Sequence, residues 1–90
     1  MFGQFLEYLN RITNGKYLYL QNDLITACQK TDYIFSAKYN GANAWASNEL
    51  YSHYVKDFED VLTGMGCRSD IKADITEKMN EFGRMSGIWC

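Results

Sequence analysis

The fold of this chain depends on residues 16–41, which read KYLYLQNDLITACQKTDYIFSAKYNG. The first five of them form an apolar, tyrosine-rich run whose composition is typical of a strand. From Asp23 onward, apolar or small residues recur every three to four positions, the period of a helix with one buried face. These residues are Leu24, Cys28, Thr31, Phe35 and Tyr39. Asp23 is a suitable N-cap and Asn40-Gly41 a suitable stop, so the period predicts a helix.

A β-hairpin is the alternative for the same segment. Its strands would be Leu24–Gln29 and Tyr33–Tyr39, and its turn would be residues 30–32. The helix predicts an all-α domain, whereas the hairpin predicts an α+β domain with a small antiparallel hairpin or meander in residues 17–39. We favour the helix.

The sequence before this segment predicts a helix over residues 2–13. Its apolar residues have the i, i+3, i+4, i+7 spacing that places them on one face, and they are Phe2, Phe5, Leu6, Leu9 and Ile12. Asn14-Gly15 follows, and both residue types tolerate a positive φ at a helix C-terminus.

The sequence after residue 41 predicts a third helix. Its helical repeat of apolar residues comprises Tyr51, Tyr54, Val55, Phe58, Val61, Leu62 and Met65. Asn43 or Ser47 is the candidate N-cap, and Gly64-Met65-Gly66 ends the helix.

A last helix is predicted to start near Ser69-Asp70. Its inner face consists of Ile71, Ile75, Met79 and Phe82. Asp74 and Lys78 form a favourable i, i+4 pair, and Gly83 is expected to loosen the end of the helix. The whole chain, residues 1–90, is therefore predicted to be one compact all-α domain of about four helices.

The composition excludes several classes of protein. The net charge of −2 argues against direct nucleic-acid binding, which needs a concentrated basic surface. No stretch approaches the roughly 20 apolar residues of a membrane span, and the first residues lack the basic leader of a signal peptide. Cys28, Cys67 and Cys90 are an odd, widely spaced set, which fits a reducing compartment better than a disulfide scaffold. We therefore expect a cytoplasmic protein without a membrane partner.

No motif predicts a metal, a cofactor or a catalytic centre. The three cysteines and His53 lack the close paired spacing of a zinc site, and the glycines form no phosphate-binding loop. Cys67 lies just before a predicted helix and beside Arg68, a position that can lower the pKa of a thiol. However, His53 is the one histidine that could activate it. We therefore expect that the chain is not an enzyme, with no catalytic, cofactor or metal site.

The third helix carries most of the excess negative charge. Residues 41–67 hold four acids and one lysine, and Asp57, Glu59 and Asp60 lie within one turn. The favoured interpretation is a solvated helix face. The alternative is a contact patch for a partner with a basic surface, because complementary charge speeds association.

Aromatic residues are the other candidates for partner contact. The chain has seven tyrosines and two tryptophans, and a small core does not easily provide a hydrogen-bond partner for every tyrosine hydroxyl. Some tyrosines should therefore be exposed, and tyrosine and tryptophan are enriched in protein interfaces. Tyr17, Tyr19 and Trp89 are the candidates.

These features predict a small protein-binding domain that acts as an inhibitor or adaptor of a larger protein. Phage-encoded antagonists of bacterial defence, including anti-CRISPR proteins, are often short, acidic and free of motifs, as are toxin-neutralising immunity proteins. The chain resembles these classes in size and composition, and no motif supports the resemblance. The alternatives are a small thiol- or carboxylate-dependent enzyme or ligand-binding domain, using Cys67 or the acidic helix, and a nucleic-acid-binding module. The sequence leaves open whether the chain forms a homo-oligomer.

Overall fold

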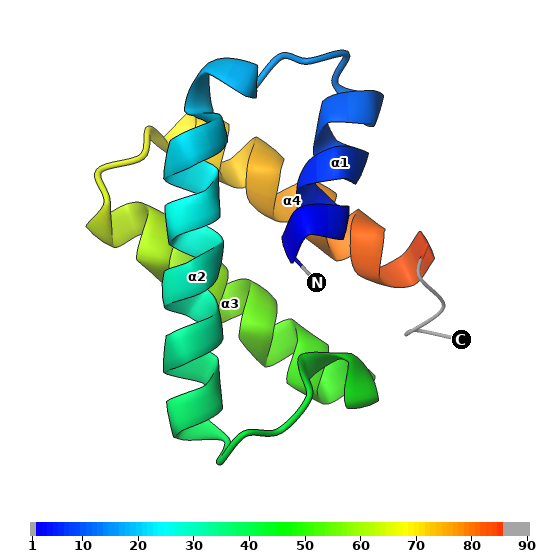
Figure 1. The fold of residues 1–90 in the computed structure, drawn as a ribbon, viewed down its shortest axis with the longest axis vertical. Helices are drawn as coiled ribbons and strands as arrows, with labels where there is room; N and C mark the ends of the chain where they lie inside the picture. Colours follow the sequence, from blue (N-terminus) through cyan, green and yellow to red (C-terminus); the bar gives the residue numbers. More distant parts are fainter. Residues whose placement is uncertain (1, 86–90) are drawn as a thin grey trace.

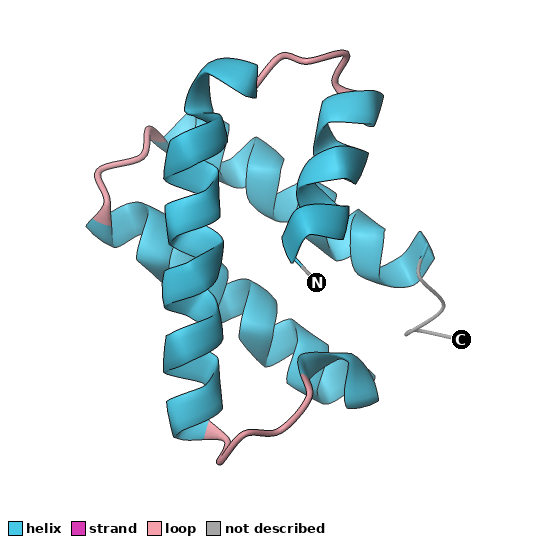
Figure 2. Cartoon of the chain, in the orientation of Figure 1, coloured by secondary structure: helices cyan, strands magenta, loops and turns pink. Residues whose placement is uncertain are grey.

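The computed structural model describes residues 2–85, and these form four α-helices (Figure 1). The helices are α1 (Phe2–Ile12), α2 (Gln21–Lys38), α3 (Asn48–Gly64) and α4 (Ser69–Met85). Two single 3₁₀ turns, η1 (Leu18–Leu20) and η2 (Ala44–Ala46), precede α2 and α3. Figure 2 shows helices and loops alone in this part of the chain, which confirms the all-α prediction.

The segment that decides the fold is a helix, so the hairpin alternative is wrong. The strand-like run before it folds into η1, which continues directly into α2 because the Gln21 N–H donates to the Leu18 carbonyl. The predicted N-cap at Asp23 is also wrong, since the helix begins at Gln21 without a side-chain cap. Asp23 instead lies in the first turn, where a negative charge complements the helix dipole.

Both Asn-Gly pairs end helices as predicted. Asn14 and Asn40 have φ angles of 53° and 55°, and the glycines that follow have φ angles of 77° and 76°. Asparagine and glycine adopt this left-handed conformation at lower cost than other residues. The chain therefore reverses direction after α1 and after α2 at positions that the sequence marks.

The two candidate N-caps before α3 both act as caps. Asn43 Oδ1 accepts a hydrogen bond from the Trp45 N–H at 3.0 Å and caps η2. Ser47 Oγ accepts one from the Leu50 N–H at 3.1 Å and caps α3. The connection between α2 and α3 is thus ordered by its own side chains.

The core lies between α3 and the other three helices. In Figure 1, α2 runs along the longest axis and crosses α3, while α1 lies over α4; α3 also packs against α4. The core includes Phe5, Leu9, Leu24, Ala27, Cys28, Phe35, Tyr51, Tyr54, Phe58, Leu62, Ile75 and Met79. The predicted inner faces are therefore largely confirmed, although Ile12, at the end of α1, is 40% exposed.

Gly83 does not loosen α4 but makes room for a neighbouring ring. A Cβ atom at this position would lie 2.3 Å from Cε2 of Tyr51. The Tyr51 ring is fully buried, and its hydroxyl donates to the backbone carbonyl of Met79 at 2.5 Å. The absence of a side chain at residue 83 therefore allows α3 and α4 to pack closely.

The core accommodates more tyrosines than the sequence predicts, because carboxylates accept their hydroxyl hydrogens. Tyr54 donates to Asp32 at 2.5 Å, and Tyr17 donates to Asp74 on α4. Burial, followed by the hydrogen bond to Asp74, raises the pKa of Tyr17 to about 12. Both bonds join residues far apart in the sequence: one ties α3 to α2, and the other ties the turn before η1 to α4.

Candidate protein-binding surface

Of the three aromatic candidates, the structure places one at the surface. Tyr17 is 2% exposed and belongs to the core, so its ring offers no surface to a partner. Tyr19 is 72% exposed, because at three residues per turn its side chain leaves the chain about 120° away from that of Tyr17. Trp89 lies outside the described residues.

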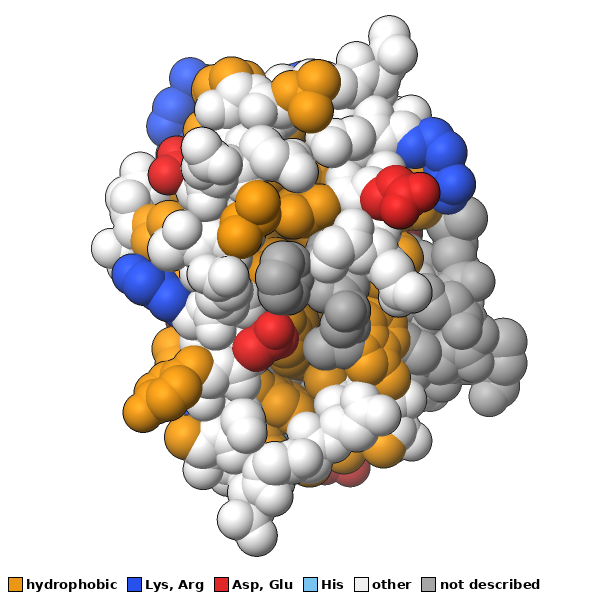
Figure 3. Space-filling view, viewed as in Figure 1, with side chains coloured by type: hydrophobic (Ala, Val, Ile, Leu, Met, Phe, Trp, Pro, Cys, Tyr) orange, Lys and Arg blue, Asp and Glu red, His pale blue; other side chains and the backbone are white. Residues whose placement is uncertain are grey.

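Leu18 and Tyr19 form an exposed apolar pair on η1. Leu18 is 57% exposed, so a large aliphatic side chain and an aromatic ring, neighbours in the chain, are both exposed to water. Figure 3 shows hydrophobic side chains reaching the surface at the end of the molecule where η1 lies in Figure 1. Such a group, unlike a single exposed leucine, is a feature of binding surfaces.

A cleft of about 410 Å³ opens beside Tyr19. It lies where η1 and the start of α2 meet the end of α3 and the start of α4, and its lining is mostly apolar. The lining residues are Tyr19, Leu20, Asp23, Leu24, Leu62, Met65, Gly66, Cys67, Arg68, Ile71 and Ile75. We call Leu18, Tyr19 and this cleft the η1 surface. Its size is within the range of pockets that bind small molecules or side chains, about 300–1,000 Å³.

Two charged residues lie at the edge of the cleft. Arg68 is paired: its Nε and Nη2 donate to the two carboxylate oxygens of Asp70, at 3.2 and 2.7 Å. This hydrogen bonding lowers the pKa of Asp70. Because both side chains are largely exposed, the pair contributes little to stability. Asp23, on the opposite wall, is exposed.

Cys67 lines the cleft in surroundings that disfavour its thiolate. Burial raises its pKa, and this effect outweighs the lowering by nearby Lys72. The raised pKa is opposite to the shift that its position before α4 suggested. His53 lies on α3 between the Tyr39 ring, at 5.4 Å between centroids, and Glu49. Within residues 2–85, no three acidic, cysteine or histidine side chains are grouped so as to hold a metal ion.

The three acids of the predicted patch do not form one solvated face. Asp57 is 5% exposed, and its Oδ1 accepts a hydrogen bond from Lys38 Nζ at 2.8 Å. Its other oxygen, Oδ2, is buried and has no hydrogen-bond partner among the residues that the structure describes. Glu59 is half-buried, and Asp60 alone of the three is exposed. The solvated-face interpretation is therefore wrong for Asp57, because the turn of α3 directs this residue towards α2.

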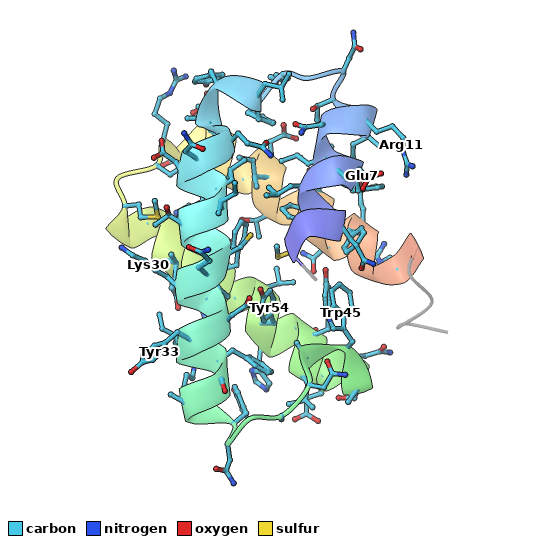
Figure 4. All side chains as sticks on the ribbon, viewed as in Figure 1. Glu7, Arg11, Lys30, Tyr33, Trp45 and Tyr54 are labelled. Carbon is cyan, nitrogen blue, oxygen red and sulfur yellow. The ribbon has the colours of Figure 1, made fainter. Side chains whose placement is uncertain are left out.

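A second exposed apolar group lies on α2 and was missed at the level of sequence. Tyr33 is 78% exposed and Ile34 is 38% exposed. Figure 4 shows Tyr33 and Lys30 pointing away from the body of the molecule. The helical period could have predicted this exposure. Thr31 and Phe35 lie on the buried face of α2, and Tyr33 is two positions from each, about 200° around the helix and so on nearly the opposite side.

No family model, curated protein or solved structure matches this chain. No helix within residues 2–85 has the length and apolar character that crossing a membrane requires. The fold defines a small all-α domain, and its candidate site is the η1 surface.

Proposed function

We propose that this chain acts by binding another protein through the η1 surface. The observation that carries the proposal is the exposure of Leu18 and Tyr19 beside an apolar cleft. Tyrosine is enriched among the residues that dominate interface energetics, and such residues commonly sit against pockets in the partner or beside pockets of their own.

The role within this class is that of an inhibitor or adaptor of a larger protein in the cytoplasm. The support is the small size, the negative net charge and the absence of a catalytic motif in the sequence. The raised pKa of Cys67 adds support, because a thiol enzyme needs a thiolate. A phage-encoded antagonist of bacterial defence, such as an anti-CRISPR protein, is the particular form that we propose on composition alone.

The test is capture from a lysate of the host organism, quantified by mass spectrometry for the wild-type chain and two matched variants. Tyr19→Ser removes an exposed tyrosine from the η1 surface, and Tyr33→Ser removes an equally exposed one from α2. We expect Tyr19→Ser, and not Tyr33→Ser, to lose at least one captured protein by tenfold or more. Equal capture by all three chains would contradict the proposal.

A further inference from the structure

The cleft of the η1 surface has an apolar interior and charge only at its edge. Leu24, Leu62 and Ile75 line it and are buried, so they form its floor. Ile71 and Met65 line it at the side and are half-buried. Such a cleft favours an apolar side chain over a charged one, because a charge placed on this floor would lose its water without gaining a partner.

The two charges at the edge differ in whether they are compensated. Arg68 has its guanidinium occupied by Asp70 through two hydrogen bonds. The Asp23 carboxylate makes no hydrogen bond or ion pair with any residue that the structure describes. The start of α2 stabilises this charge through the helix dipole but does not neutralise it. Asp23 is therefore the uncompensated charge of the lining.

We propose that the cleft binds a segment of a partner protein in which an apolar side chain has a lysine or arginine next to it. The apolar side chain enters the cleft, and the basic group pairs with Asp23. Complementary charge at the edge of an apolar pocket selects partners and fixes their orientation. The inference rests on the proposed function, because it specifies the chemistry of the partner that the η1 surface takes.

The experiment is a methyl NMR titration of the full chain with three matched peptides. They are acetyl-Ala-Lys-Phe-Lys-Ala-amide, the same peptide with glutamine in place of lysine, and the same peptide with glutamate. A fourth probe, 4-phenylbutylamine, carries a ring and an ammonium group without a peptide. Ligands of this size bind in roughly the millimolar range, which such titrations measure.

We expect the lysine peptide to shift the methyl signals of Leu24, Ile71 and Ile75. It should bind at least about threefold more tightly than the glutamine peptide, and the glutamate peptide should bind most weakly. In Asp23→Asn the preference for lysine should disappear. In Asp60→Asn, which removes an exposed acid away from the cleft, the preference should be unchanged. Circular dichroism checks that both variants are folded.

Four results would overturn the inference. They are no shift of these methyl signals with the lysine peptide, equal binding of the three peptides, tighter binding of 4-phenylbutylamine than of the lysine peptide, and shifts that depend on protein concentration without any probe. The third result assigns the cleft to a small amine, and the fourth assigns it to a second copy of the chain. Any of these results combined with Tyr19-dependent capture leaves the proposed function standing. Selective binding of the lysine peptide without such capture leaves the cleft chemistry standing and removes the proposed function.

Discussion

Replacement of Gly83 by alanine should destabilise the protein, although alanine is the better helix former. In a helix interior the exchange normally gains about 1 kcal/mol. Here the new Cβ would lie 2.3 Å from Cε2 of Tyr51, against at least 3.4 Å for an ordinary contact. The ring must therefore retreat by about 1 Å within a packed core. Overpacking of this kind costs roughly 1–3 kcal/mol, and the clash is severe enough that we expect a net loss of about 1–2 kcal/mol.

Urea denaturation followed by circular dichroism measures this loss as a lower midpoint at an unchanged slope. The melting temperature should fall by roughly 4–15 °C for a domain of this size. Gly64→Ala is the matched control, because a Cβ atom at the end of α3 meets nothing within 4 Å and the φ angle there is not positive. It should leave stability unchanged or raise it slightly.

A double-mutant cycle tests whether the Tyr51 ring causes the loss of stability in Gly83→Ala. Tyr51→Leu destabilises the protein by itself, because it removes a buried ring and its hydrogen bond to Met79. In that background the clash is absent, so Gly83→Ala should become neutral or stabilising. If Gly83→Ala costs the same in both backgrounds, or raises stability in the wild-type chain, the close packing of α3 and α4 is not the reason for the glycine.

Two further predictions concern the polar groups of the core. Lys38→Met should lower the midpoint of urea denaturation, because it leaves the buried Asp57 carboxylate unpaired. The loss is reduced because Lys38 is half exposed. Asp60→Asn, the exposed control, should change stability by less than about 0.5 kcal/mol. Tyr17→Phe should raise the pKa of Asp74, measured by NMR, towards the ordinary value of 3.8, since the hydrogen bond from Tyr17 is the main cause of its lowered pKa. A carboxyl whose pKa is lowered in the folded state stabilises the protein above its unfolded pKa, and this contribution is lost as the pH falls through the folded pKa. Tyr17→Phe removes most of this contribution, so the variant should lose less stability than the wild type when the pH falls below about 4.

The features that the sequence predicted correctly depend on neighbours in the chain. The helical period of residues 24–39, the caps at Asn43 and Ser47, and the two Asn-Gly stops are local properties, because each depends on backbone angles or on bonds within a few residues. The start of α2 was missed by three residues, since the N-cap position is Leu20 and not Asp23. There the helix is entered from η1, so no side-chain cap was needed to begin it.

The features that the sequence did not predict depend on distant residues. The sequence around Gly83 is the same whether this glycine frays the end of α4 or makes room for a neighbouring ring. Only the position of Tyr51 decides between the two roles. Asp57 belongs to an acidic run that is typical of a solvated face, but Lys38, 19 residues earlier, donates a hydrogen bond to it between α2 and α3. Both depend on how the helices pack, which propensity and period do not specify.

Whether a tyrosine is buried also depends on distant residues, and this bears on the candidate site. Tyr17 and Tyr54 are buried because Asp74 and Asp32, distant in the sequence, accept their hydroxyl hydrogens. A tyrosine for which packing provides no such acceptor stays at the surface, where water serves its hydroxyl. Tyr19 is of this kind, since its hydroxyl bonds to no other described residue and its ring is 72% exposed. The core therefore does not explain why a tyrosine occupies position 19, and the apolar cleft beside it is the reason to assign that tyrosine to a partner.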